Sequence, residues 1–430
     1  RSVPRGVPPA PPPEAPWALP TSLVFAPRRA ECDARGYYDL TRDMNRRLFD
    51  VDFQRACLKE RFVQQLCKRG SKDKPTPHEA AERLHQIRGV VGNYYSATLK
   101  AYNYYAAYSM SPSDDILSMR LNELQVFYND CDVPDPESRF CKQAHLDQMF
   151  VGVNFEEKMK DRTELNKYNS DTELTRFEWL EILLRTCIAK YGNGERTDDA
   201  AQAYSMLMET NVLPNLPEEA MTDTNDFRRG RMYNEAVDLR LHEERELLRL
   251  LYDLHAAKKR RKTVGLLQWY DLLECADLLH TEETGLSEED MNVWQKVSAT
   301  HQCGLREAKR VYLWSRMQVV DDVKHSDRAR SLTFVDFNEA VCRLAELLCV
   351  PDVGDDTDPD TIVAREEDAP VDLTRHLRDK LDTFFKLLKH SLCHHYKAAD
   401  YEALIKTLKQ VLGGLQSGSI TAFDLENMFP

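Results

Sequence analysis

Glycine and long apolar runs are scarce in this sequence. Glycine accounts for only 16 of the 430 residues, which disfavours folds with many tight turns and favours helices. No stretch approaches the roughly 18 consecutive apolar residues of a membrane-spanning helix, so no membrane span is expected. The formal net charge of −13 argues against a general nucleic-acid-binding protein, because such proteins need a basic face.

The short motifs of common enzymes are also missing. The sequence contains no GxxxxGK[ST], GxSxG or HExxH motif, and no acid–base or nucleophile constellation stands out. The 11 cysteines are scattered without a CxxC motif, which is typical of free thiols in a reducing compartment. We therefore expect a protein that is not an enzyme and needs no cofactor.

Two segments differ in composition from the rest of the chain. Eight of the 20 prolines lie in residues 1–20, where we expect an extended arm that is either a disordered tail or a clamp on a partner. Residues 351–370 carry eight acidic side chains against the single Arg365 and are expected to form an extended linker. Long stretches between these segments, such as 38–70 and 79–108, have apolar residues at helical spacing.

A ten-residue pattern recurs along the chain. Residues 174–183 (LTRFEWLEIL) and 332–341 (LTFVDFNEAV) share Leu-Thr, an acidic residue, an aromatic residue, a glutamate and two apolar residues in the same order. More divergent copies lie at 119–127, 264–273 and 420–425. Each of the first four copies follows a stretch with helical spacing, so the pattern predicts repeated helix–loop–helix units.

This pattern resembles the second half of an EF-hand calcium loop and the start of the helix that follows it. Loop position 8 would be held by Met119, Leu174, Val264, Leu332 and Ile420. In EF-hands, the residues at this position join two loops in a short two-stranded pairing. Loop position 12, the place of the last calcium ligand, would be held by Glu123, Glu178, Gln268, Asp336 and Asp424. The alternative is an unrelated all-α protein with repeated amphipathic helix starts.

The loops have lost most of the side chains that would bind calcium. A calcium loop supplies about six to eight oxygen ligands, mostly from positions 1, 3, 5, 7, 9 and 12. The second loop is the least altered, with Asn169, Asp171 and Glu178 at positions 3, 5 and 12, but Lys167 stands at position 1. The fourth loop keeps Asp336 at position 12. These four polar residues are therefore weak candidates for metal ligands, and we expect no calcium dependence.

The sequence as a whole predicts an all-α protein with two pairs of degenerate EF-hand-like units, flanking helical segments and an extended N-terminal arm. The predicted divisions are the Pro-rich arm (1–36), a helical segment (37–80), the first pair (81–195), a linker (196–230), the second pair (231–350), the acidic linker (351–370) and C-terminal helices with a fifth, partial unit (371–430). Paired EF-hands open a hydrophobic groove that grips a partner helix, so these units are expected to act as docking modules.

Two sets of residues are candidates for partner contacts. The first set consists of the aromatic residues after loop position 12, which are Trp179, Trp269 and Phe337. The second set is the basic run Lys258, Lys259, Arg260, Arg261 and Lys262. Such a run would steer an acidic partner towards the protein, although a short basic run is also typical of a solvated loop.

Four segments extend the resemblance to a family. They are LTRFEWLEILLR, LTFVDFNEAVCRLAELL, REAKRVYLWSRM and DFRRGRMYNEAVDL. They are similar to segments of the degenerate EF-hand-repeat proteins, distant relatives of calmodulin, that occur among the flagellar and ciliary components of protists. The resemblance covers roughly residues 81–430. It implies a structural or adaptor subunit in the axoneme, with other subunits and tubulin as candidate partners. A calcium sensor and an accessory subunit of another complex, for instance an organellar one, remain as alternatives.

Overall fold

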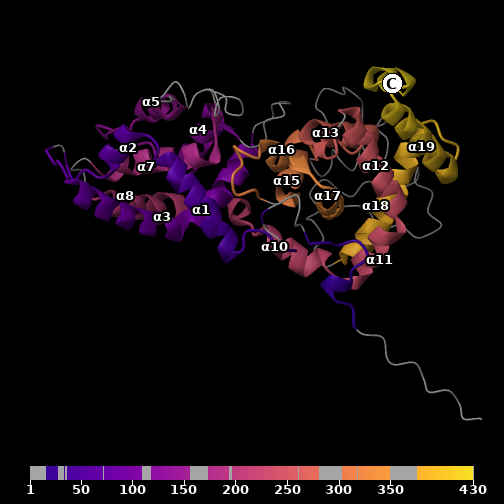
Figure 1. The fold of residues 1–430 in the computed structure, drawn as a ribbon, viewed down its shortest axis with the longest axis horizontal. Helices are drawn as coiled ribbons and strands as arrows, with labels where there is room; N and C mark the ends of the chain where they lie inside the picture. The colour runs from indigo at the N-terminus through magenta and orange to yellow at the C-terminus, as the bar shows by residue number, and fades with distance from the viewer. Residues whose placement is uncertain are drawn as a thin grey trace, which may run out of the picture.

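The protein forms two helical modules that lie side by side along its long axis (Figure 1). The computed structural model describes residues 16–27, 33, 36–70, 72–108, 118–154, 173–192, 196–259, 261–279, 303–316, 318–348 and 375–429. Most of these residues are helical, and their only strands form two short two-stranded sheets. This confirms the all-α prediction. None of the described helices is both long and apolar enough to cross a membrane.

The first module spans residues 42–221 and has its own hydrophobic core. Its first half contains α1 (Arg42–Ala56), α2 (Glu60–Leu66), α3 (Pro77–Ala106), β1 (Met119–Arg120), α4 (Leu121–Asp130) and α5 (Gln143–Asn154). Its second half contains β2 (Glu173–Leu174), α7 (Arg176–Tyr191), α8 (Ala200–Met206), η2 (Leu207–Val212), α9 (Leu213–Asn215) and η3 (Glu218–Met221).

The second module spans residues 224–429 and includes η1 (Leu19–Thr21) from the N-terminal arm. It begins with α10 (Thr224–Phe227), η4 (Arg228–Met232), α11 (Glu235–Glu243), α12 (Arg245–Lys258), β3 (Val264–Gly265) and α13 (Leu266–Cys275). It continues with α15 (Leu305–Ser315), α16 (Ser326–Ala329), β4 (Ser331–Leu332), α17 (Phe334–Leu347), α18 (Leu377–His395), α19 (Tyr401–Ser417) and α20 (Ala422–Met428).

Each module is organised around one antiparallel strand pair. In the first module Met119 lies opposite Leu174, and in the second Val264 lies opposite Leu332. These are the four residues that the repeat places at loop position 8. The first copy of the repeat therefore pairs with the second, and the third copy pairs with the fourth. Ile420, from the fifth copy, lies in a bend and not in a strand.

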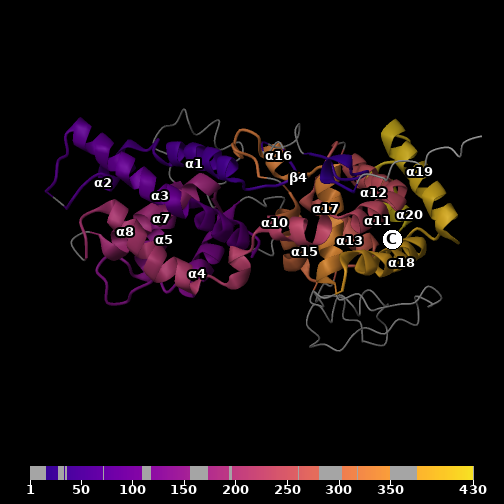
Figure 2. The ribbon, with the colours of Figure 1, turned by 90° about the horizontal axis from the view of Figure 1, so that it is seen from below.

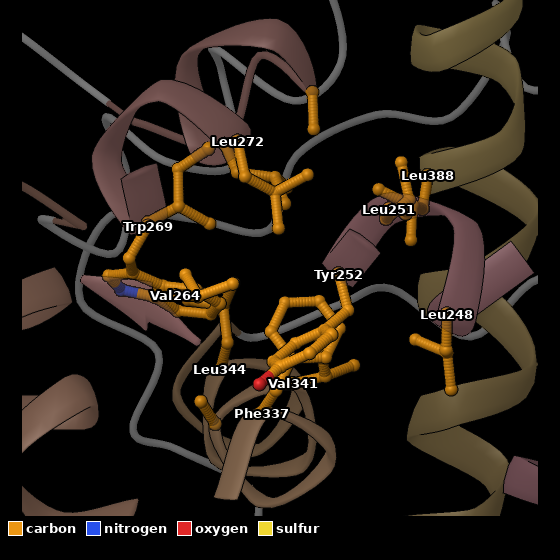
Figure 3. Close-up of a cluster of buried hydrophobic side chains, with 14 of the residues drawn as sticks. Leu248, Leu251, Tyr252, Val264, Trp269, Leu272, Phe337, Val341, Leu344 and Leu388 are labelled. Atoms are coloured by element: carbon orange, nitrogen blue, oxygen red, sulfur yellow. The ribbon is translucent and has the colours of Figure 1, made fainter. Parts of the chain in front are cut away.

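A buried tryptophan links the two halves of each pair. The indole Nε1 of Trp179, on α7, donates to the carbonyl oxygen of Thr98 on α3 at 3.0 Å. The indole Nε1 of Trp269, on α13, donates to the carbonyl oxygen of Ala308 on α15 at 3.1 Å. Figure 3 shows Trp269 and Phe337 in the core of the second module. Trp179 thus joins α7, which follows β2, to α3, which precedes β1. Trp269 likewise joins α13, which follows β3, to α15, which precedes β4.

The predicted linker 196–230 is wrong, because most of this segment is helical and packed. Helix α8 lies against α3 and α7, as the view from below shows (Figure 2). Tyr204 and Leu207 are fully buried in the first core. The two prolines that suggested a linker lie beyond α8, where Pro214 is within α9 and Pro217 directly precedes η3, so neither prevents this packing.

Candidate functional site

The carboxylates at loop position 12 act as helix caps. Glu178 accepts hydrogen bonds from the backbone nitrogen and the hydroxyl of Thr175 at 2.8 and 2.7 Å. Asp336 accepts the same two bonds from Thr333 at 3.0 and 2.8 Å. Both side chains are buried. In this geometry the carboxylate satisfies free groups at the start of the helix that follows, so its stabilising role needs no metal ion.

The other two weak metal candidates, Asn169 and Asp171, lie outside the described residues. Within the described ranges, no group of three or more His, Cys, Asp or Glu side chains is arranged to hold a metal ion. The absence of a cofactor stays a prediction.

The basic run divides into a paired residue and an exposed stretch. Lys258, at the end of α12, contacts Asp271 on α13 at 2.6 Å. Lys259, Arg261 and Lys262 are exposed, whereas Arg260 lies outside the described residues. Three side chains of the run are therefore available to an acidic partner, and Lys258 stabilises the packing of its own module.

The proposed contact role of the three aromatic residues is wrong for this conformation. Trp179, Trp269 and Phe337 have exposed fractions of 1%, 0% and 0%. The residue after loop position 12 lies on the first turn of its helix, and this turn faces the sister unit. These side chains therefore fill the two cores and present no surface to a partner.

The expectation of an open groove also changes, because the chain covers the apolar face of each pair with its own helices. In the first module α8 packs on α3 and α7, and in the second module α18 packs on α11, α13 and α17 while α19 packs on α12. Leu381 and Leu388 of α18 are buried in the second core. Figure 3 shows Leu388 next to Leu251 of α12. A partner helix would have to displace these segments to reach either face.

The two modules meet at a buried ion pair. The guanidinium of Arg176, at the start of α7, donates to both carboxylate oxygens of Asp52 on α1 at 2.6 and 2.9 Å. It also donates to the carbonyl oxygens of Val319 and Val320, in the second module, at 3.1 and 2.7 Å. Asp322 follows at 3.6 Å. Arg176 therefore joins two helices of its own module to a segment of the other.

A second buried cluster lies on the side of the other module. Arg228, with an exposed fraction of 0%, donates to Glu339 on α17 at 2.9 Å and to Asn225 on α10 at 2.9 Å. Asn225 also exchanges two hydrogen bonds with the backbone of Asp39. The carboxylate of Asp39 accepts from the backbone nitrogen of Gln318 at 2.9 Å. The segment before α1 is thereby bound to the same stretch that contacts Arg176.

Buried arginines and buried carboxylates are equally numerous at this junction, but the Nε of Arg316 has no hydrogen-bond partner among the described residues. Its buried arginines are Arg176, Arg228, Arg316 and Arg343, and its buried carboxylates are Asp39, Asp52, Asp322 and Glu339. Burying an isolated charge is costly, and a buried pair is tolerated only when its remaining donors and acceptors are also satisfied. Of these buried side chains, Arg176 makes contacts that cross between the modules, with Val319, Val320 and Asp322. The junction therefore favours one relative placement of the modules, since sliding them would leave donors of this buried guanidinium without acceptors.

The described part of the N-terminal arm is bound within the chain. Both carboxylate oxygens of Asp238, on α11, accept hydrogen bonds from Trp17, Ser22 and the backbone nitrogen of Val24 at 2.7 to 3.0 Å. Phe25 is buried against the second core. Figure 1 shows this indigo segment beside α11. Residues 16–27 are thus part of the second module, whereas residues 1–15 lie outside the described ranges.

Sequence reasoning missed the junction and the site that holds the arm. A signal for the junction was present, because Asp52 lies on the apolar face of α1, four residues after the buried Leu48 and four before the buried Ala56. A charge at such a position must have a buried partner. The sequence does not identify that partner, since Arg176 is 124 residues away.

Comparison with protein-family models, with curated protein sequences and with solved structures finds no match. The assignment of a function therefore rests on the residues and contacts described above.

Replacing Arg176 by methionine should lower the free energy of unfolding by about 3–5 kcal/mol, because Asp52 would stay buried without its partner. Arg46→Met is the control, since Arg46 and Asp43 form an exposed pair of a kind that contributes about 0–1 kcal/mol. Urea unfolding of both variants measures the difference. Adding Asp52→Leu to Arg176→Met should restore part of the lost stability, because the buried carboxylate is then removed as well. If Arg176→Met and Arg46→Met lowered the free energy of unfolding equally, the account would be contradicted.

Stability should also depend on pH through His255. Burial lowers the pKa of this imidazole, whose Nδ1 lies 2.7 Å from Asp271. When the pH falls below about 6.5, the usual pKa of histidine, this imidazole binds a proton in the unfolded chain but not in the folded one. The free energy of unfolding therefore falls as the pH decreases, by up to about 1.4 kcal/mol per pH unit.

His255→Asn should reduce this slope in urea unfolding between about pH 7.5 and 5.5. His78→Asn is the control, because the side chain of His78 is exposed, and this variant should keep the slope of the unmodified protein. An unchanged slope in His255→Asn would show that the imidazole is not held neutral.

Proposed function

We propose that this protein is a non-catalytic structural or adaptor subunit of a large protein assembly, with the ciliary or flagellar axoneme as its site. The observation that carries the proposal is the junction, where the buried Arg176 donates to acceptors in both helical modules. A subunit that spaces or orients other proteins needs such a fixed geometry, because a flexible connection would not transmit position from one end to the other.

The strand pairing supports the interpretation of each module as a degenerate EF-hand pair. The repeat places Met119 and Leu174 at equivalent loop positions, and these residues lie opposite each other in an antiparallel pair. Val264 and Leu332 are related in the same way. Two helix–loop–helix units joined at this loop position are the arrangement that the EF-hand resemblance implies.

The state of the loops favours a constitutive role over a calcium switch. The carboxylates of Glu178 and Asp336 are bound to the threonines at the start of their helices. The apolar faces that a calcium sensor exposes to its target are covered here by α8 and α18. We therefore propose that partners bind to outer surfaces of the modules and that calcium does not control the binding.

The axonemal part of the proposal rests on the sequence resemblance. Other axonemal subunits are the proposed partners, and tubulin is a further one because its surface is acidic. Lys259, Arg261 and Lys262 are exposed at the end of α12, where they would contact such a surface. Surface charges of this kind mainly accelerate and orient association.

Fractionation of the tagged protein from ciliated cells tests the proposal. We expect the protein to remain with detergent-extracted axonemes and to resist a high-salt wash, because a permanent interface is large and partly apolar. Release by detergent, or copurification with an organelle, would contradict the axonemal assignment and favour an accessory subunit elsewhere. Release only after calcium addition would instead favour the calcium sensor.

A further inference from the structure

A groove of about 1010 Å³ lies between α1 and α3 on the first module. Residues 42–50 of α1 form one wall and residues 85–96 of α3 form the other. The wall on α3 covers about three helical turns, or roughly 17 Å at 1.5 Å per residue. Because α1 lies outside the EF-hand-like units, this groove is separate from the apolar faces that α8 and α18 cover.

Two glycines of α3, Gly89 and Gly92, line the groove. Gly89 and Gly92 lie in the middle of a 30-residue helix, where each glycine costs about 1 kcal/mol relative to alanine. A methyl group at Gly92 would lie 3.1 Å from Phe49, which explains that glycine within the protein. A methyl group at Gly89 would meet no atom within 4 Å. The fold itself therefore does not require glycine at position 89.

Glycine at an exposed helix position allows another backbone to approach closely. Gly89, Gly92 and Ser96 follow one another at spacings of three and four residues, so their small side chains share one face of α3. Small residues along the α3 wall leave room for the backbone of a second helix. At the length of this wall, the groove would accommodate about three turns of such a helix, or roughly 12 residues.

The rim of the groove is basic although the whole chain carries a net charge of −13. Its cations are Arg42, Arg46 and Arg88, and its acids are Asp43 and Asp50, which leaves an excess of one positive charge. Arg46 pairs with Asp43, and Arg88 contacts Asp50. Arg42 is exposed, and no ion pair within the described residues involves it. The charge excess on the rim therefore favours an acidic occupant.

We propose that this groove binds an acidic, amphipathic helix of a partner subunit. A narrow stripe of small and apolar residues on the partner would lie over Gly89 and against Phe49. Carboxylates on its flanks would pair with Arg42, Arg46 and Arg88. The exposed ion pairs that Arg46 and Arg88 now make are weak, so exchanging their partners costs little.

The proposal rests on the adaptor function only in that both require a protein partner. A groove that binds no helix would leave retention on axonemes unaffected. Conversely, a protein that is released from axonemes would still bind the helix. The two ideas therefore fail in separate experiments.

A selection with a displayed library of helical peptides tests the groove. The peptides are about 18 residues long, or five turns, and their faces are randomised among Ala, Leu, Glu and Lys. The full chain is the target, and the Gly89→Leu variant removes peptides that bind elsewhere, because a leucine at this position fills the floor of the groove. We expect the enriched peptides to carry a net negative charge on the flanks of one Ala/Leu stripe.

An enriched peptide should bind at least about tenfold more weakly to Gly89→Leu, and its affinity should fall with ionic strength. Gly152→Leu is the matched control, because Gly152 on α5 is also exposed with no atom near its added methyl group. Gly89→Ala, which favours the helix, distinguishes loss of the groove from loss of folding. The proposal is overturned if no peptide binds the unmodified protein more tightly than Gly89→Leu, or if the enriched peptides are basic or uncharged.

Discussion

The contacts of the buried Arg176 are the interactions on which the arrangement of the two modules depends, and the first of them binds both carboxylate oxygens of Asp52 within its own module. Both groups are buried, and the guanidinium has two further acceptors in the carbonyl oxygens of Val319 and Val320. In a low-dielectric interior, charges separated from their partners are expensive. The contact with Asp52 therefore favours the packing of α1 on α7, and the contacts with Val319 and Val320 favour the docking of the second module on the first. The cluster around Arg228 extends this constraint to the segment that precedes α1.

In both modules the chain covers its own apolar surface with further helices. The strand pairs bring four amphipathic helices together, and α8 or α18 then covers the apolar face that remains. Burial of this face contributes roughly 25 cal/mol for each Å² of apolar surface removed from water, so a competitor has to replace these contacts before it binds. The proposed partners would therefore bind to its outside, where the basic stretch after α12 and the groove between α1 and α3 are found.

The parts that the sequence predicted are those that depend on local patterns. Helical spacing and the repeat indicated the helices and the four pairing residues, because a loop and the helix after it are encoded within about ten positions. The linker prediction for 196–230 failed because Pro214 and Pro217 outweighed the apolar spacing of Tyr204 and Leu207. The buried junction was beyond prediction, since matching Asp52 with Arg176 requires knowledge of the tertiary fold. The covering of the apolar faces could not be predicted either, because the tertiary fold decides which helix packs on which face.

The most direct test of this account is the distance between the two modules in solution. Spin labels introduced through unnatural amino acids at Glu82 on α3 and Gln410 on α19, both exposed, would report it without touching the buried cysteines. If the junction fixes the relative placement of the two modules, double electron–electron resonance should give one narrow distribution of distances between the labels. Arg176→Met should broaden this distribution. A broad distribution in the unmodified protein would contradict the account, because it would show that the modules move independently.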